Sequence, residues 1–186
     1  MTSTPKKEST LVNELLADAY ASRVNDLKRS VSLAEEALAI SREMNDKSLI
    51  GRSLNMLSLF LMIMAEYARS EETSKEAIAI FEELNDEKGI ADAKYNIAGI
   101  YYKTDNFHLG LAYLIDCLSI YKKYKDYHNE SRTEKSLGTI YEYFGDVNNA
   151  IQSYEDAIEA GKKSGDQNLE SNVYNNLSGL YLAVQR

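Results

Sequence analysis

The chain offers few side chains of the kind that catalyse reactions or hold metal ions. It has one cysteine, Cys117, and two histidines, His108 and His128. Cys117 occupies a position where equivalent segments carry alanine, so we expect a small buried side chain rather than a nucleophile. Each histidine falls in a turn or a joint between helices, with no cysteine or carboxylate at metal-ligand spacing. The chain also lacks a phosphate-binding glycine loop and the common hydrolase motifs. We therefore predict that it is not an enzyme and has no cofactor.

Composition and charge limit the kinds of partner that the chain can bind. The 186 residues carry a net charge of -8, which disfavours nucleic acid because phosphate neutralisation supplies most of that affinity. The longest apolar run, from Leu57 to Ala65, falls well short of the roughly 20 residues that span a membrane. The first ten residues are polar and lack the apolar core of a signal peptide. We predict a cytoplasmic protein that binds neither nucleic acid nor membrane.

Aromatic residues recur through the chain at a nearly fixed interval. Tyr20, Phe60, Tyr101, Tyr141 and Tyr181 are spaced by 40, 41, 40 and 40 residues. A fixed period of this length is typical of stacked repeats. Apolar residues at helical spacing around each aromatic predict one helix per repeat, called helix A. Small residues that recur every 40 positions predict a second helix, called helix B, packed closely against it. These are Ser30, Ser70, Gly110 and Ala150, and Ala37, Ala77, Cys117 and Ala157.

Another periodic mark separates the repeats. Aspartates recur at 46, 86, 126 and 166, where each can cap the next helix A. Asn45, Asn85 and Gly165 precede three of them and suit the left-handed conformation that ends a helix. Lys125 breaks this pattern, so we expect a looser joint there. The predicted organisation is a flexible leader at 1–9, repeats at about 10–45, 46–85, 86–125 and 126–165, and a fifth helix A at 166–186. The fold class is all-α.

The fourth repeat resembles the tetratricopeptide (TPR) consensus. The residues that carry the resemblance are Leu137-Gly138, Tyr141, Gly145, Ala150, Tyr154 and Ala157. The resemblance covers roughly residues 11–186. The sequence departs from the consensus because it lacks the tryptophan that begins helix A and the proline that follows helix B, and because its period is 40 residues rather than 34. This longer form is similar to kinesin light chain, the Leu-Gly-Asn adaptors and bacterial TPR sensors. The resemblance implies a right-handed α-solenoid whose A helices line a concave groove that binds a peptide or a partner helix.

The resemblance also implies partner-binding residues. An asparagine before the central leucine of helix A holds peptide backbone in those families, and it matches Asn55, Asn96 and Asn176. A carboxamide can donate to one carbonyl and accept from one N–H, which would hold an extended backbone. The alternative is that these asparagines cap or bridge neighbouring helices. The other groove-facing positions are Tyr95, Gly99, Tyr102, Lys103, Arg132, Lys135, Ser136, Thr139, Tyr143, Asn172, Asn175 and Gly179.

Three basic residues in this set raise the question of ligand charge. Lys103, Arg132 and Lys135 could attract an acidic peptide or a C-terminal carboxylate. The alternative is that each is an ordinary solvated surface charge. The complete lysine, asparagine and arginine set that clamps two carboxylates in chaperone-binding TPR proteins cannot be placed on this sequence.

Two segments indicate a second class of function. Residues 57–64 are apolar all round, which fits burial between neighbouring repeats or else a groove lining or self-association. The last helix, 168–186, keeps the inner stripe of a helix A and has no partner, so we expect the natural polypeptide to continue. The sequence thus predicts a protein- or peptide-binding module, the sensor or docking part of a larger signalling protein. The alternative is a structural spacer that forms a homodimer through the second hairpin or the last helix.

Overall fold

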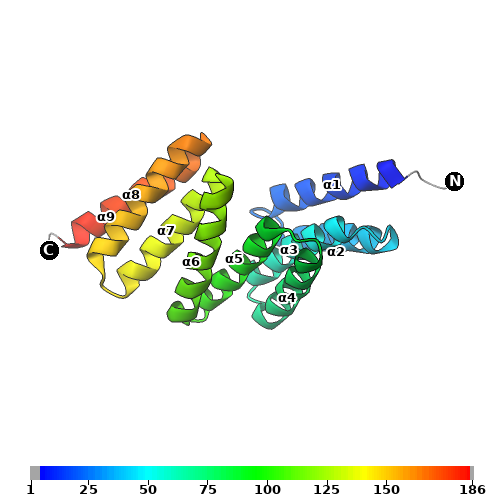
Figure 1. Ribbon diagram of the computed structural model, residues 1–186, viewed down its shortest axis with the longest axis horizontal. Coiled ribbons are helices and arrows are strands. Elements are labelled where there is room, and N and C mark those ends of the chain that lie inside the picture. The colour runs from blue at the N-terminus through cyan, green and yellow to red at the C-terminus, as the bar shows by residue number, and fades with distance from the viewer. Residues whose placement is uncertain (1–4, 185–186) are drawn as a thin grey trace. The chain divides into compact units, whose positions relative to one another are not determined.

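The computed structural model describes residues 5–184, and the regular structure of that part consists of nine α-helices (Figure 1). They are α1 Pro5–Ser22, α2 Leu27–Glu43, α3 Lys47–Ile63, α4 Tyr67–Glu83, α5 Glu87–Lys103, α6 Phe107–Tyr124, α7 Tyr127–Tyr143, α8 Val147–Ser164 and α9 Gln167–Val184. Successive helices form antiparallel pairs, which confirms the predicted all-α fold of helix hairpins. Helix α1 already begins at Pro5, inside the predicted leader, because proline suits the first position of a helix.

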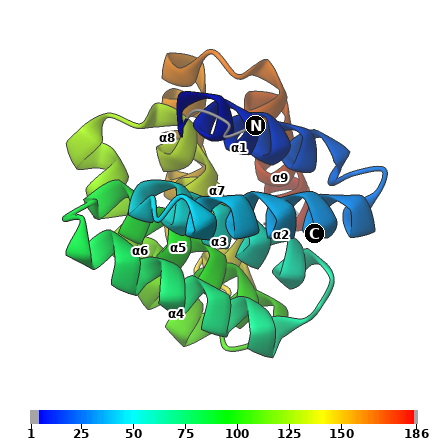
Figure 2. The same cartoon turned by 90° about the vertical axis from the view of Figure 1, so that its right-hand side faces the viewer.

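The chain divides into two compact units, residues 1–100 and residues 101–186, and the division falls near the end of α5. Unit 1 holds α1 to α4 and most of α5. Both views show α1 running beside α2 (Figures 1 and 2). Unit 2 holds the end of α5 and α6 to α9, where α7 packs against both α6 and α8, and α8 against α9.

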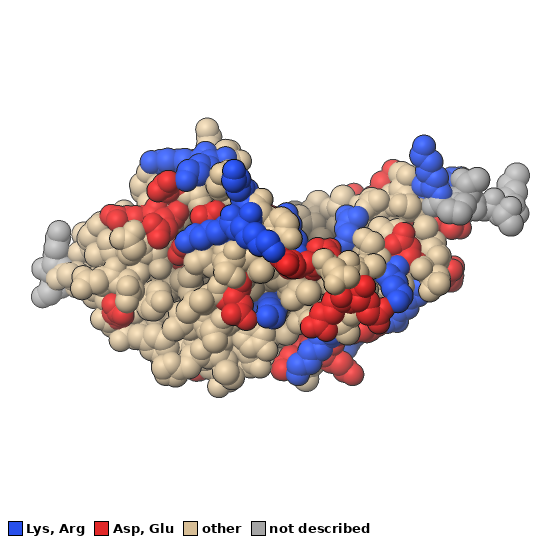
Figure 3. All heavy atoms as spheres, viewed as in Figure 1, with Lys and Arg blue, Asp and Glu red and all other residues tan. Residues whose placement is uncertain are grey.

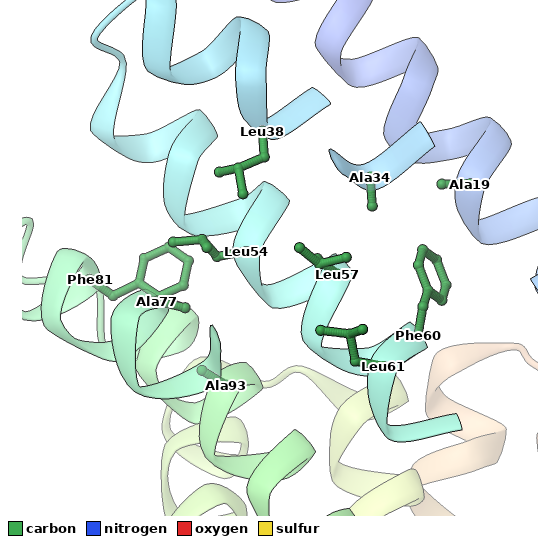
Figure 4. Packing of buried hydrophobic residues seen from close by; sticks show 10 residues of the cluster. All are labelled: Ala19, Ala34, Leu38, Leu54, Leu57, Phe60, Leu61, Ala77, Phe81 and Ala93. Carbon is green, nitrogen blue, oxygen red and sulfur yellow. The ribbon is translucent and has the colours of Figure 1, made fainter. Parts of the chain in front are cut away.

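The core of unit 1 is built around α3. Leu57, Phe60 and Leu61 of that helix are buried among side chains of α1, α2, α4 and α5 (Figure 4). The apolar segment 57–64 is thus largely core, although Ile63 remains exposed. Phe81 of α4 fits closely beside α3, since a Cβ atom at Gly51 would lie 2.7 Å from its ring. These contacts favour burial over a role as a free apolar surface.

The core of unit 2 lies between α7, α8 and α9. Ala150, Tyr154, Ala157 and Ile158 of α8 pack with Val173, Leu177 and Leu180 of α9. Tyr154 lies directly under α7, where a Cβ atom at Gly138 would come within 2.6 Å of the ring carbon Cε1. The small residues predicted from their 40-residue spacing are buried in all four hairpins, as close helix packing requires.

The helix ends follow the predicted caps. Each periodic aspartate accepts a hydrogen bond from the backbone N–H three residues later, at 3.1 Å for Asp46, 3.0 Å for Asp86, 3.2 Å for Asp126 and 3.0 Å for Asp166. Asn45, Asn85 and Gly165 have the predicted left-handed backbone, with φ values of 53°, 53° and 74°.

The prediction of a looser joint at Lys125 is wrong. Lys125 adopts the same left-handed conformation, with φ of 54°, and the joint that follows is capped like the others by Asp126. The packing of α6 against α7 and the aspartate cap together impose this turn. They do so against the preference of a lysine side chain for negative φ.

Candidate functional site

Unit 2 contains an open pocket of about 610 Å³. Its lining comes from the end of α5 and from α7, α8 and α9. The lining residues are Tyr102, Thr139, Glu142, Tyr143, Tyr154, Asn175, Asn176 and Gly179. Six of these were expected from the sequence to face the groove, and the structure brings them together: Tyr102, Thr139, Tyr143, Asn175, Asn176 and Gly179.

The floor of the pocket is organised by the hydroxyl group of Tyr154. It donates a hydrogen bond of 2.9 Å to Oε2 of Glu142 and lies 3.2 Å from Oγ1 of Thr139. Asn176 also hydrogen-bonds this hydroxyl group. Burial raises the pKa of Tyr154 to about 12, and the neighbouring Glu142 carboxylate adds to the rise. The phenol therefore stays protonated at neutral pH and holds the carboxylate in place.

One wall of the pocket is aromatic. Tyr102 and Tyr143 both contact the buried ring of Phe107, with ring centroids 5.6 Å and 3.8 Å away. Tyr143 is 65% exposed and Tyr102 is 38% exposed. Phe144 extends the cluster, 5.9 Å from Tyr143. Large aromatic side chains that stay exposed in an ordered cluster are typical of a contact surface for a partner.

Another part of the wall is polar and comes from α9. Asn175 is exposed and Asn176 half-buried. Gly179 follows one turn later, and a Cβ atom built there would have no neighbour within 4 Å. This wall therefore offers two carboxamides beside open space, so that a ligand backbone can approach closely.

The other two asparagines of the expected ladder lie in unit 1 and have a different environment. Asn96 is buried, and its side chain donates to the carbonyl oxygen of Asn55 at 2.9 Å, to Oδ1 of Asn55 at 2.7 Å and to Oγ of Ser58 at 3.1 Å. These bonds join α3 to α5. This geometry matches the alternative interpretation, in which the asparagines bridge neighbouring helices.

The remaining predicted residues lie outside the pocket lining. Arg132 donates to Oδ1 of Asn129 at 3.1 Å, and the Ser136 hydroxyl donates to the backbone carbonyl of Arg132 at 3.0 Å. Nζ of Lys103 lies 6.0 Å from the ring centroid of Tyr102. The other four are Tyr95, Gly99 and Lys135, all half-buried, and Asn172, which is exposed. A partner contact for these residues stays a prediction.

Basic side chains gather over the C-terminal ends of α6 and α8 (Figure 3). The last turns of these helices carry Lys122, Lys123, Lys162 and Lys163, where a positive charge offsets the helix dipole. Nζ of Lys122 lies 2.7 Å from a carboxylate oxygen of the buried Glu134. Burial raises the pKa of Glu134, and the lysine opposes that rise. Lys122 thus has a partner inside the fold, and none of these four lysines lines the pocket.

Sequence reasoning missed two pocket residues, Glu142 and Tyr154. The apolar stripe of α8 placed Tyr154 in the core, which is correct for its ring, but its hydroxyl group reaches the pocket. Glu142 carries no repeat signal, because the positions 40 residues before and after it are Tyr102 and Leu182.

A metal site and a membrane-spanning helix are both absent from residues 5–184. That part of the chain has no group of three histidine, cysteine or acidic side chains able to hold a metal ion. It also has no helix long and apolar enough to cross a membrane. Cys117 is fully buried in α6, as its place in the repeat predicted.

Comparisons with known proteins agree with this architecture. Residues 89–163 match the tetratricopeptide repeat family. No curated protein matches the chain in sequence. Among solved structures, a Rap protein complexed with competence and sporulation factor is 16% identical with a TM-score of 0.78, over 100% of this chain and 56% of that one.

Two further structures share the fold. A STAND ATPase with a tetratricopeptide repeat sensor from Pyrococcus horikoshii is 20% identical with a TM-score of 0.76, over 91% of this chain and 26% of that one. A putative kinesin light chain from Podospora anserina with TPR-like repeats is 13% identical with a TM-score of 0.65, and both chains are covered completely. At these identities the likeness shows the fold alone. The chain spans about half of the Rap protein and about a quarter of the ATPase.

Proposed function

We propose that this chain, a tetratricopeptide repeat protein, is a non-catalytic interaction module that binds a peptide segment of another protein in the pocket of unit 2. The observation that carries the proposal is the lining of that pocket. It combines two exposed aromatic rings with two carboxamides and a glycine. Aromatic surfaces bury apolar side chains of a partner, and carboxamides pair with its backbone.

An extended peptide fits this lining better than a helix does. The backbone N–H and C=O groups of a helix already bond to one another, so the carboxamides of Asn175 and Asn176 would find few partners on it. An extended segment presents unpaired backbone groups to both. The open space at Gly179 leaves room for such a backbone to pass close to α9.

We further propose that the module is the sensor or docking part of a larger signalling protein. Support comes from two structures that share its fold. One contains a tetratricopeptide repeat sensor within a signal transduction ATPase, and the other is a Rap protein in complex with competence and sporulation factor. In each case the region similar to this chain is a fraction of the whole protein.

The test is selection from a displayed library of random linear peptides, followed by fluorescence polarisation with the winning sequences. Asn175→Ala should weaken binding roughly tenfold, since it removes a hydrogen bond to the peptide backbone. Asn176→Ala should weaken binding at least as much, because it also removes the bond to the Tyr154 hydroxyl group. Asn168→Ala is the matched control, because it removes an exposed carboxamide from the first turn of the same helix, outside the pocket. Failure to enrich any peptide, or equal binding by all three variants, would refute the proposal.

Self-association is the second candidate, and α9 provides the observation that favours it. Tyr174, Tyr181, Leu182 and Val184 are exposed on this helix, whereas most of the apolar second hairpin is buried. Sedimentation over a range of concentrations decides the matter. A dimer that Leu182→Glu dissociates would support this candidate, and a strict monomer at the highest concentration would remove it.

A further inference from the structure

We infer that the pocket of unit 2 selects peptides by an arginine side chain, which Glu142 binds through its carboxylate while an adjacent tyrosine ring covers the guanidinium plane. The inference rests on the proposed function and adds the chemical class of the ligand. Of the two interpretations that the sequence left open for Lys103, Arg132 and Lys135, it agrees with ordinary surface charge and runs against attraction of an acidic peptide.

Among the residues that line the pocket, Glu142 has a charged side chain and the others do not. One of its oxygens, Oε2, accepts the Tyr154 hydroxyl hydrogen at 2.9 Å, which fixes the orientation of the carboxylate. Within residues 5–184, Glu142 forms no ion pair with a basic side chain. A pre-oriented carboxylate with an oxygen left for a ligand attracts a cationic donor.

Two aromatic rings line the same pocket as this carboxylate. Tyr143 follows Glu142 directly in α7, and Tyr102 lines the same pocket from the end of α5. Both rings are held by contacts with Phe107, so their positions are set before a ligand arrives. A cation over such a ring face is attracted by the ring quadrupole, and the attraction adds to that of a nearby carboxylate.

The rest of the lining does not oppose a cation. Thr139, Asn175, Asn176 and Gly179 are neutral, and neither Lys103 nor Lys135 lines the pocket. The net charge of -8 favours approach of a basic segment at long range. The local and the overall charges therefore both favour a basic peptide over an acidic one.

Arginine suits this arrangement better than lysine. Its guanidinium group is flat, so it can stack on a tyrosine ring and still donate a hydrogen bond, in the plane of the group, to the remaining oxygen of Glu142. An ammonium group would satisfy the carboxylate but would gain less from the exposed ring. The shape of the pocket thus predicts a preference for arginine among basic residues.

The test uses the full chain and four libraries of acetylated, amidated heptapeptides, random except for a central arginine, citrulline, lysine or glutamate. Citrulline keeps the shape of arginine without its charge. The arginine library should be retained roughly tenfold more than the citrulline library, because a charge-assisted bond is lost. Glu142→Gln, which can still accept from Tyr154, should abolish that difference. Glu155→Gln, which removes an exposed acidic group of α8 outside the pocket, should keep it.

Each other outcome has a definite meaning. Equal retention of the arginine and citrulline libraries, or best retention of the glutamate library, would overturn the inference and leave the proposed function standing. Retention of arginine that survives Glu142→Gln would also overturn it. Loss of the arginine-over-lysine preference in Tyr143→Leu would support the stacking contact. No retention of any library would remove the proposed function itself.

Discussion

Replacing Gly138 by alanine tests the link between packing and the pocket. A Cβ atom at this position would lie 2.6 Å, 2.7 Å and 3.0 Å from three carbons of the Tyr154 ring. That ring is fully buried, and its hydroxyl group is bonded to Glu142. The ring therefore cannot move aside without giving up either packing or this hydrogen bond.

Two opposing effects set the magnitude. Alanine in a helix interior is favoured over glycine by about 1 kcal/mol. Overpacking a filled core costs about 1–3 kcal/mol, and the displaced hydrogen bond about 1 kcal/mol more. We expect Gly138→Ala to lower the free energy of unfolding by about 1–3 kcal/mol in spite of its better helix propensity.

Urea denaturation followed by circular dichroism measures the effect. Gly179→Ala is the matched control, because it makes the same change in α9 where a Cβ atom meets nothing within 4 Å. It should leave stability unchanged or raise it by up to about 1 kcal/mol. If Gly138→Ala were as stable as Gly179→Ala, the close contact between α7 and Tyr154 would be refuted.

Four other changes follow from the same structure. Because burial raises the pKa of Tyr154 to about 12, the free energy of unfolding should hold below about pH 10 and fall as the pH rises toward 12. Urea titrations at each pH measure this fall, and Tyr154→Phe should flatten it. Lys122→Met should lower the free energy of unfolding by about 1–3 kcal/mol at pH 7, because it leaves the buried Glu134 carboxylate without its partner. Burial raises the pKa of Glu134, so this residue becomes neutral near pH 4 and the loss should be smaller there. An equal loss at both pH values would contradict this. Ala65→Gly should stabilise by about 1 kcal/mol, since alanine there has φ of 63°, and a lower urea midpoint would disprove the strain. Asn96→Ala should destabilise by about 1–3 kcal/mol without changing the affinity for selected peptides, and weaker binding at full folding would restore its role as a ligand contact.

Much of the fold was predictable because each repeat is specified by local chemistry. The signals that specify a repeat each depend on a few neighbouring residues, so they can be recognised in the sequence. They are an aspartate that caps a helix, a small residue where two helices pack closely, and a stripe of apolar residues. Lys125 shows where such reading fails. The packed helices on either side fix its backbone, and its side-chain type does not reveal that.

The pocket was only partly predictable. The resemblance identified residues that face outward from one helix surface, such as Thr139 and Asn175, since repeat position fixes that direction. It could not show that Tyr154 reaches across from α8 to hold Glu142, because this bond joins positions without periodic equivalents. It also could not show that Asn96 is buried between α3 and α5, whereas Asn176, although bonded to Tyr154, lines the pocket.

The most direct test of the central claim is a two-dimensional ¹⁵N–¹H NMR titration of the full chain with a selected peptide. Binding in the pocket of unit 2 predicts that the largest shifts occur at Thr139, Tyr143 and Gly179 and at the side-chain amides of Asn175 and Asn176. Shifts confined to other residues, such as Tyr174 and Leu182 on the exposed side of α9, would contradict the account.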